Sequence, residues 1–229
     1  MCIVSVGGCT TVGMHDPAAF QGIDFGPRQP LRFCLLRDRG VTASQADQVM
    51  TAIASELDRY GLDVHVAWTR EWHPASSSSP QLMNELVSHP IESPCDRLLA
   101  LVARRSGEQL RGMLVDGFGS VETNTSTHGY VFVPVPADAN LGRDPGAVAV
   151  HETYHLLGCG HDSTLAPCYR RIAEMKAAAR ANRRDGREFF PGYSLSGEVI
   201  STRTAVNALI EEALRDSADA AVPHERNPD

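Results

Sequence analysis

The chain has 229 residues, 42% of them hydrophobic and 21% charged, which is typical of a globular protein and supports one sizeable domain with room for two lobes. The net charge of −7, without a long basic run, argues against nucleic acid as a partner. No apolar stretch approaches the ~18 residues of a transmembrane helix, so we expect no membrane span.

The N-terminus resembles the end of an export signal. The first nine residues have no basic start, and their apolar stretch is too short for a complete signal peptide. However, Val6-Gly7-Gly8-Cys9 resembles a bacterial lipobox, in which cleavage precedes a cysteine that is then lipidated. We therefore expect residues 1–29 to be a signal remnant and tether. The protein would be exported, as a cell-envelope lipoprotein attached to the membrane through Cys9 or as a secreted protein of the periplasm or exterior. The alternative is a frayed N-terminus with two incidental cysteines.

The first predicted elements are a strand, a helix and a second strand. The apolar run 31–36 predicts a buried strand. Thr42 and Gln45 fit a capping box, and Gly61 closes the helix that follows, whose apolar residues recur at helical spacing. Apolar and polar residues alternate over 62–68, which predicts a half-buried strand.

A short helix and further strands are predicted between residues 81 and 133. We expect a short helix at about 81–88, a central strand over 96–104, and strands at 113–115 and 130–133. The polar segment 117–127 suits an edge strand, whose free backbone groups can pair with an extended peptide, although an exposed loop is the alternative. For His128 we expect a solvated loop position rather than the lining of a cleft. Asp144 and Pro145 are typical of the start of a helix.

The segment from His151 to His161 carries the chemistry. Its sequence, HETYHLLGCGH, fits H-E-x-x-H-x-x-G-x-x-H at every specified position. On a helix, His151 and His155 lie one turn apart on one face, and Glu152 lies beside them as a proton acceptor. Gly158 can end the helix with a positive φ and let the chain return His161 as a third nitrogen ligand. Three protein ligands leave a fourth tetrahedral position open for water, which indicates a catalytic zinc site.

These eleven residues resemble the zinc signature of the metzincin clan of metalloproteases. Asp162, directly after the third histidine, is similar to the adamalysin branch. The resemblance implies a zinc peptidase in which His151, His155 and His161 bind one zinc ion and Glu152 acts as the general base.

One part of the metzincin pattern is missing. Metzincins carry a methionine in a tight turn beneath the zinc, shortly after the third histidine, and residues 162–170 contain none. Cys168-Tyr169 lies near the position where matrixins carry Met-Tyr, and the next methionine, Met175, falls in a predicted helix. Three alternatives stay open: Cys168 underlies the metal, a disulfide braces the site, or Met175 reaches in from its helix.

Four cysteines remain if Cys9 is an anchor and the residues before it are removed. They allow three pairings. A Cys159–Cys168 bond would tie the exit of the zinc helix to the turn below the metal, and Cys34–Cys95 would link the first strand to the start of a later one. An oxidising compartment favours such bonds; four buried free thiols are the alternative.

The remaining sequence completes an α+β prediction. A basic helix is expected from Cys168 to about 183, an aromatic turn at 189–193, and a last helix over about 203–215. The order of elements matches a zincin-like, metzincin-type upper lobe (about 30–160) with a twisted mixed sheet, a backing helix and the zinc helix. A smaller, mainly helical lower lobe (about 161–216) would complete the catalytic domain, 30–216, and 217–229 would be a disordered tail.

The predicted function is that of a zinc-dependent metalloendopeptidase. Glu152 would take the proton from a zinc-bound water and pass it to the leaving amine. Tyr169 and Tyr193 are candidates to assist. We expect a peptide or protein substrate and a monomeric enzyme. The alternatives are a zinc hydrolase of cell-wall peptides and a non-catalytic zinc-binding envelope protein; the intact Glu152 argues against the second.

Overall fold

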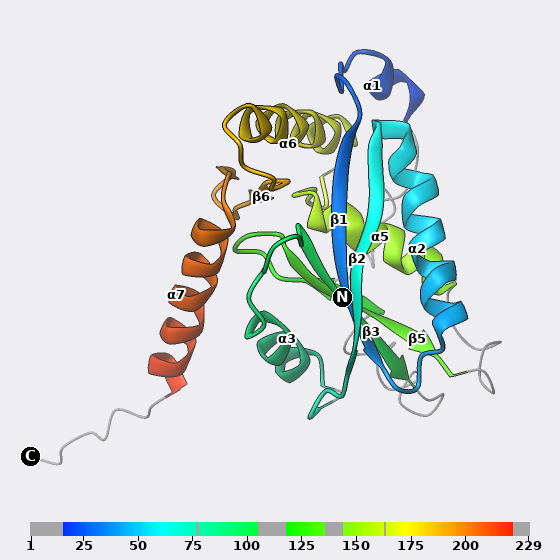
Figure 1. The fold of residues 1–229 in the computed structure, drawn as a ribbon, viewed down its shortest axis with the longest axis vertical. Helices are drawn as coiled ribbons and strands as arrows, with labels where there is room; N and C mark the ends of the chain where they lie inside the picture. Colours follow the sequence, from blue (N-terminus) through cyan, green and yellow to red (C-terminus); the bar gives the residue numbers. More distant parts are fainter. Residues whose placement is uncertain (1–15, 77, 105–117, 136–143, 163, 222–229) are drawn as a thin grey trace, which may run out of the picture.

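The computed structural model describes residues 16–76, 78–104, 118–135, 144–162 and 164–221. They form a mixed α/β fold around a five-stranded sheet of order β2-β1-β3-β5-β4 (Figure 1). The first four strands in that order are parallel, and β4 pairs with β5 antiparallel at one edge. The strands are β1 (Gln29–Asp38), β2 (Leu62–Trp72), β3 (Arg97–Arg104), β4 (Gly119–Val121) and β5 (His128–Pro134).

Helices cover both faces of this sheet. The helices α2 (Ala43–Leu57) and α5 (Pro145–Leu156) lie on one face, and α3 (Ser79–Val87) and α7 (Arg203–Ala221) lie on the other (Figure 1). The central strand β3 shows why: Leu99 and Leu101 enter the core beneath α2 and α5, whereas Leu98 and Ala100 enter the core beneath α3 and α7. A strand buried on both faces has a continuous apolar sequence instead of an alternating one.

The predicted start and end of the first long helix are confirmed. Thr42 and Gln45 form the capping box at the start of α2. The chain then passes through a short 3₁₀ helix, η1 (Asp58–Tyr60), and turns into β2 at Gly61, which has a φ of 62°. The strand expected at 113–115 lies outside the described residues.

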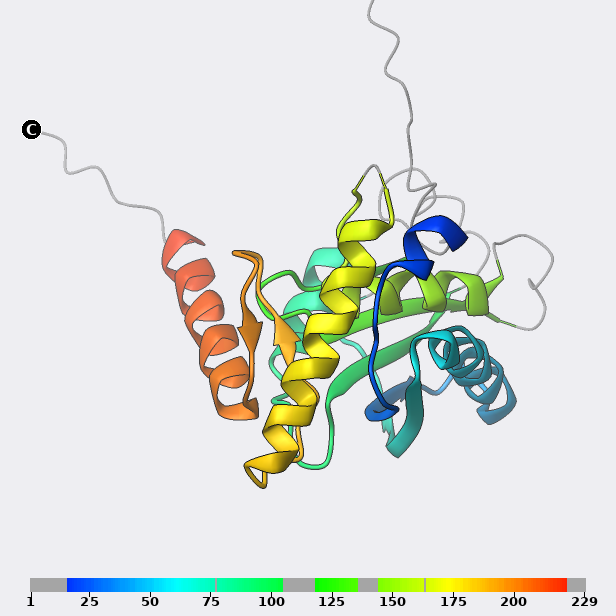
Figure 2. The same ribbon diagram turned by 90° about the horizontal axis from the view of Figure 1, so that it is seen from above.

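The C-terminal part is mainly helical, as expected. It contains α6 (Ala166–Arg184), a hairpin of β6 (Gly192–Tyr193) and β7 (Val199–Ile200), and α7. The hairpin lies between α6 and α7 in two perpendicular views (Figures 1 and 2). The helix α7 continues to Ala221, so the first residues of the predicted tail, 217–221, are helical. None of the helices in the described ranges is long and apolar enough to cross a membrane.

The C-terminal end of the expected tether, from residue 16 onward, packs against the domain. A short helix, α1 (Pro17–Gln21), precedes β1. Phe20 and Phe25 pack against the rings of Tyr60 and Tyr169, with ring centroids 5.2–6.4 Å apart. Aromatic rings at such distances contribute favourable packing. Cys9 and the lipobox-like residues lie outside the described residues.

Two disulfides follow the expected pairing. Cys34 in β1 is bonded to Cys95, just before β3, and Cys159 is bonded to Cys168 in α6. All four cysteines are buried.

Candidate metal centre

The helix that carries the histidine motif begins as the sequence predicts. The carboxylate of Asp144 accepts a hydrogen bond of 3.1 Å from the backbone N–H of Gly146, and Pro145 occupies the first turn of α5. Val148 and Leu156 of α5 are buried in the core beneath α2. The helix is therefore fixed along its length against the sheet and α2.

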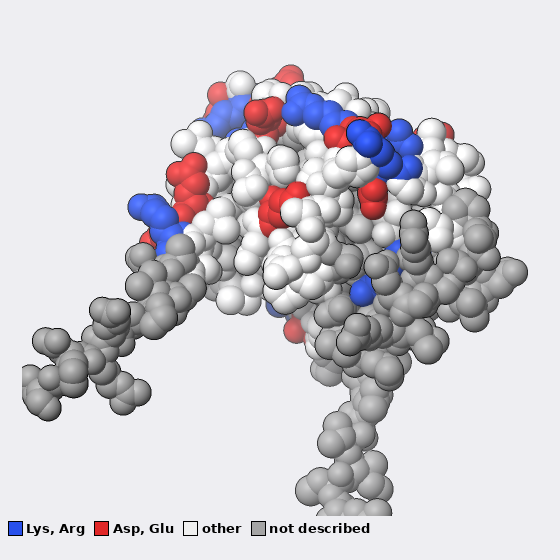
Figure 3. Space-filling view, turned by 90° about the horizontal axis from the view of Figure 1, so that it is seen from below, with Lys and Arg blue, Asp and Glu red and all other residues white. Residues whose placement is uncertain are grey.

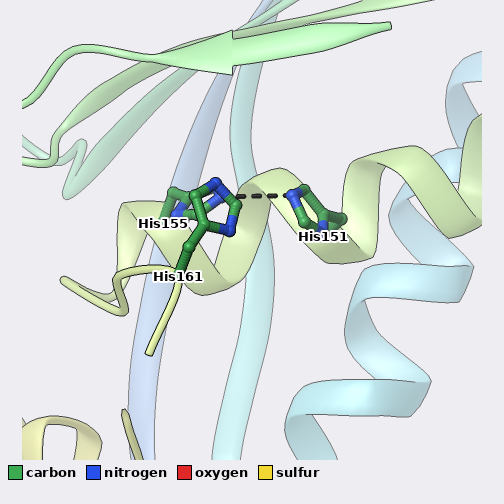
Figure 4. Close-up of side chains that lie close together, drawn as sticks. All are labelled: His151, His155 and His161. Carbon is green, nitrogen blue, oxygen red and sulfur yellow. Dashed lines mark hydrogen bonds between the residues drawn. The ribbon is translucent and has the colours of Figure 1, made fainter. Parts of the chain in front are cut away.

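His151, His155 and His161 meet at one point beside α5 (Figure 4). One ligand atom from each of these three residues lies within 4.8 Å of the others. The Nε2 atoms of His151 and His155 are 3.2 Å apart. Two nitrogens bound to one tetrahedral zinc ion are about 3.3 Å apart, given Zn–N bonds of about 2.0–2.1 Å. The donor set and its spacing therefore fit a zinc ion.

The protonation of His155 suits a metal ligand. Its Nδ1 lies 2.7 Å from the backbone oxygen of Cys159, which leaves Nε2 to face the other two histidines. Burial lowers the pKa of His155 to about 4, so the ring is neutral near pH 7. A neutral imidazole oriented through its second nitrogen is the usual form of a metal-binding histidine.

The chain leaves α5 through a tight turn at Gly158. The N–H groups of Gly158 and Cys159 donate to the carbonyl oxygens of His155 and Tyr154, at 2.9 and 3.0 Å, which is the Schellman arrangement at a helix end. Gly158 has a φ of 72°, and a Cβ atom there would lie 2.6 Å from the Tyr193 ring. Glycine is thus required twice at this position, for its backbone conformation and for space.

Glu152 lies on the side of α5 that faces β4. Only 6% of its surface is exposed, and a Cβ atom at Gly119 would approach its Cγ to 2.7 Å. Burial raises the pKa of Glu152 to about 8. A buried carboxyl group next to a cluster of metal-binding residues is typical of a catalytic acid or base.

An open cleft of about 880 Å³ lies over these residues. One wall consists of α5 and the edge strand β4 with the turn after it. The other consists of the segment 158–161 and the hairpin tip 193–197, where Leu195 is 75% exposed. The expected edge strand is confirmed over Gly119–Val121, at the edge of the sheet.

Of the two tyrosine candidates, only Tyr193 lines the cleft. Tyr169 is fully buried in the aromatic cluster with Phe20 and Phe25, and its hydroxyl accepts a hydrogen bond from the backbone N–H of Asp16. Tyr169 is therefore a packing residue.

The structure also distinguishes the three alternatives for the missing methionine. Cys168 is bonded to Cys159, and Met175 is fully buried in α6 without lining the cleft. Of the three expectations, the structure contains the disulfide.

The expected solvated position of His128 is wrong. His128 is fully buried, with Nδ1 2.9 Å from the hydroxyl of Thr127 and Nε2 2.8 Å from the carbonyl oxygen of His89. It begins β5 in the interior of the sheet, where both ring nitrogens have partners.

A buried arginine at the start of β3 supports the site. The Arg97 guanidinium is fully buried and donates to the carbonyl oxygens of Leu156, Phe190 and Pro191. It thus joins the end of α5 to the turn that leads to Tyr193. A cation at the C-terminus of a helix is favourable, but an arginine within an apolar strand gives no sequence signal for this contact.

A buried carboxyl group fixes the turn after β4. The Glu122 carboxylate accepts from the backbone N–H groups of Thr125 and Thr127, at 3.0 and 2.8 Å. The same turn holds the hairpin: the Tyr193 N–H donates to Thr125 O, and the Ser126 hydroxyl donates to Tyr193 O, both at 2.9 Å. The two walls of the cleft are therefore connected at this end.

No protein-family model matches the sequence, and no curated protein matches it. Among solved structures, one described as a chaperone–substrate complex is similar with a TM-score of 0.41 and 11% identity, over 57% of this chain and 23% of that chain. Archaemetzincin from Methanopyrus kandleri is similar with a TM-score of 0.38 and 18% identity, over 66% of this chain and 96% of that chain. Both TM-scores are below 0.5, so neither likeness supports an argument about this chain.

Proposed function

We propose that this chain is a zinc-dependent metalloendopeptidase of the metzincin type, with one catalytic zinc ion. A single observation carries the proposal: three imidazoles converge beside the buried carboxyl group of Glu152 in an open cleft. A structural zinc site needs no such carboxyl group and usually has four protein ligands.

His151, His155 and His161 would hold the ion through three ring nitrogens. A bound zinc ion supplies Lewis-acid polarisation of the scissile carbonyl and lowers the pKa of a water molecule. Glu152 would accept the proton of the attacking water on its carboxylate and deliver it to the leaving nitrogen. The Tyr193 hydroxyl, on the opposite wall of the same cleft, would donate a hydrogen bond to the substrate carbonyl oxygen.

The edge strand β4 would bind the substrate backbone in extended form. β4 pairs with β5 on one side and lines the cleft on the other, so its outer backbone groups are placed to add a substrate strand. Apolar residues such as Val121, Val148 and Leu195 line the same space. An open groove beside an edge strand favours polypeptide substrates over small amides, although a cell-wall peptide with a polypeptide-like backbone is the second candidate.

We also propose that the protein acts after export from a bacterial cell, as a monomer. Two buried disulfides support an oxidising compartment, and lipidation of Cys9 would attach the protein to the membrane. On the face shown in Figure 3, acidic and basic side chains are interspersed along the upper rim, so the described part of that face carries no continuous basic surface of the kind that binds nucleic acid.

Cleavage of a mixed peptide library by the zinc-loaded protein tests the function, beside Glu152→Ala and a matched control. The control is Glu211→Ala, an exposed glutamate on α7. The proposal predicts cuts by the wild type and the control that disappear in Glu152→Ala. If the wild type and the control both bind zinc but cleave no peptide, the peptidase proposal is overturned and a binding role is favoured.

A further inference from the structure

The third histidine, His161, is held in place differently from His151 and His155. His151 and His155 are carried by a regular helix, whereas His161 follows the helix end in a segment without regular structure and is exposed. An exposed side chain on an irregular segment loses more conformational entropy on being fixed than one on a packed helix. Something outside the local backbone must therefore hold His161 near the other two ligands.

The Cys159–Cys168 disulfide closes a short loop around His161. The two cysteines are 9 residues apart, with Cα atoms 4.7 Å apart, and both are buried, at 3% and 1% exposure. Cys159 also contacts the site through its backbone, because its carbonyl oxygen lies 2.7 Å from Nδ1 of His155. One residue thus orients the second ligand and fixes the start of the loop that carries the third.

The far end of the loop is attached to a packed part of the molecule. Cys168 lies in the first turn of α6, whose Tyr169, Ile172 and Met175 are completely buried. A second connection follows His161 directly: the carboxylate of Asp162 lies 2.7 Å from the Arg171 guanidinium, one turn further along α6. His161 is therefore held on both sides, by a disulfide before it and an ion pair after it, and both lead to α6.

We propose that the Cys159–Cys168 disulfide and the Asp162–Arg171 ion pair position His161 for metal binding, in place of the methionine turn that this chain lacks. The inference rests on the proposed function only in that the site binds zinc. Cys159, Cys168, Asp162 and Arg171 are positioning residues here and contribute no ligand atom. Zinc affinity is then coupled to formation of this disulfide, so the metal centre matures fully only where the bond can form.

A purely structural disulfide is the competing explanation, and the chain contains a matched control. Cys34–Cys95 is also buried, but it joins residues 61 apart, between β1 and the start of β3. The stabilisation from a disulfide grows with the length of the loop it closes. Removing Cys34–Cys95 should therefore lower the melting temperature at least as much as removing Cys159–Cys168, without weakening zinc binding.

The test compares Cys159→Ala/Cys168→Ala with Cys34→Ala/Cys95→Ala in the full chain, below both melting temperatures. Zinc affinity is measured by competition with a chromophoric chelator, and coordination by the visible absorption of the Co²⁺-substituted protein. We expect a 10- to 100-fold weaker zinc affinity and an altered Co²⁺ spectrum for the first variant, a size typical of lost outer-shell support, and neither change for the second. Equal zinc affinities and equal spectra in the two variants would overturn the proposal.

A second, milder variant tests the ion pair separately, with the disulfide intact. Arg171→Gln retains the disulfide and removes the ion pair, and should weaken zinc binding by about 3- to 10-fold as part of the same outer-shell support. Unchanged zinc affinity in Arg171→Gln would overturn the role of the ion pair. Because these readouts need no substrate, they stay separate from the peptidase test: zinc affinity can depend on the disulfide even if no peptide is cleaved.

Discussion

The two walls of the cleft are built in different ways. The wall that contains His151, Glu152 and His155 consists of regular elements, the helix α5 and the strand β4, and is held by its own backbone hydrogen bonds and by core packing. The opposite wall, segment 158–161 with the hairpin tip 193–197, has little regular structure. It is held by contacts with other segments: the hairpin side by Arg97 and the turn at Thr125, and segment 158–161 by α6. The regular wall thus carries two of the three proposed zinc ligands and the proposed general base, whereas the positions of His161 and Tyr193 depend on a few tertiary contacts.

Arg97 is the contact whose loss should change the second wall most. Arg97→Met would leave the carbonyl oxygens of Leu156, Phe190 and Pro191 without their buried donor. We expect the free energy of unfolding to fall by about 3–5 kcal/mol, as measured by urea denaturation. Arg28→Met removes an arginine paired at the surface with Asp58 and Asp63 and should cost far less. Equal losses in the two variants would show that the buried arginine does not hold the wall.

Gly158 is the position where the two segments of the second wall, 158–161 and the hairpin tip 193–197, touch. Gly158→Ala should lose about 1–2 kcal/mol for the positive φ and about 1–3 kcal/mol more for the contact with the Tyr193 ring. Gly186→Ala isolates the first part, because Gly186 has a φ of 74° and no atom within 4 Å of a Cβ there. Chemical denaturation of both variants checks the difference. A Gly158→Ala variant no less stable than Gly186→Ala would mean that these two segments do not press together here.

Glu152 tests the regular wall through the pH dependence of stability in the metal-free protein. Burial raises its pKa from 4.5 to about 8 in the folded chain. Between about pH 4.5 and pH 8 the folded state keeps a proton that the unfolded state has lost, so the free energy of unfolding falls as the pH rises over this range and levels off above about pH 8. From about pH 6.5 to pH 8.5 the chelator-treated wild type should lose roughly 2 kcal/mol relative to Glu152→Gln.

The comparison with Glu152→Gln removes the opposite contribution of His155. The pKa of that histidine is lowered to about 4, so it makes the free energy of unfolding rise with pH, mostly below pH 6.5. This contribution is the same in both proteins. Parallel pH profiles of the wild type and Glu152→Gln would contradict a buried, protonated carboxyl group.

The smallest effect is expected from Leu195→Ser, which should change only the preference among peptide substrates. Leu195 is exposed at the tip of the second wall, so a bound substrate would cover it. Leu195→Ser should lower kcat/KM for peptides with an apolar side chain at the contacted position by about 3- to 10-fold, from the apolar area no longer buried. The melting temperature should stay unchanged. The control is Leu209→Ser, at an exposed leucine of α7; an equal fall in kcat/KM there would exclude a specific contact.

The difference between the walls also explains what the sequence could predict. His151, Glu152 and His155 follow from a helical repeat, and the edge strand and the capping box of α2 follow from local patterns. The pairing of Cys159 with Cys168 was one of three alternatives, since only the fold brings two cysteines together. Arg97, Glu122 and the burial of His128 were not predicted, because their partners are carbonyl and amide groups on distant segments. Such contacts leave no periodic signal in a single sequence.

The most direct test of the account measures metal content and peptide cleavage together in the wild type, His155→Ala and Glu152→Gln. We predict about one zinc ion per chain and cleavage for the wild type. Glu152→Gln should retain the zinc ion with kcat/KM lower by about 10²–10⁴-fold, the contribution of a general base, and His155→Ala should lose both. A Glu152→Gln variant that cleaves peptides like the wild type, or a wild type that binds no zinc, would contradict the account.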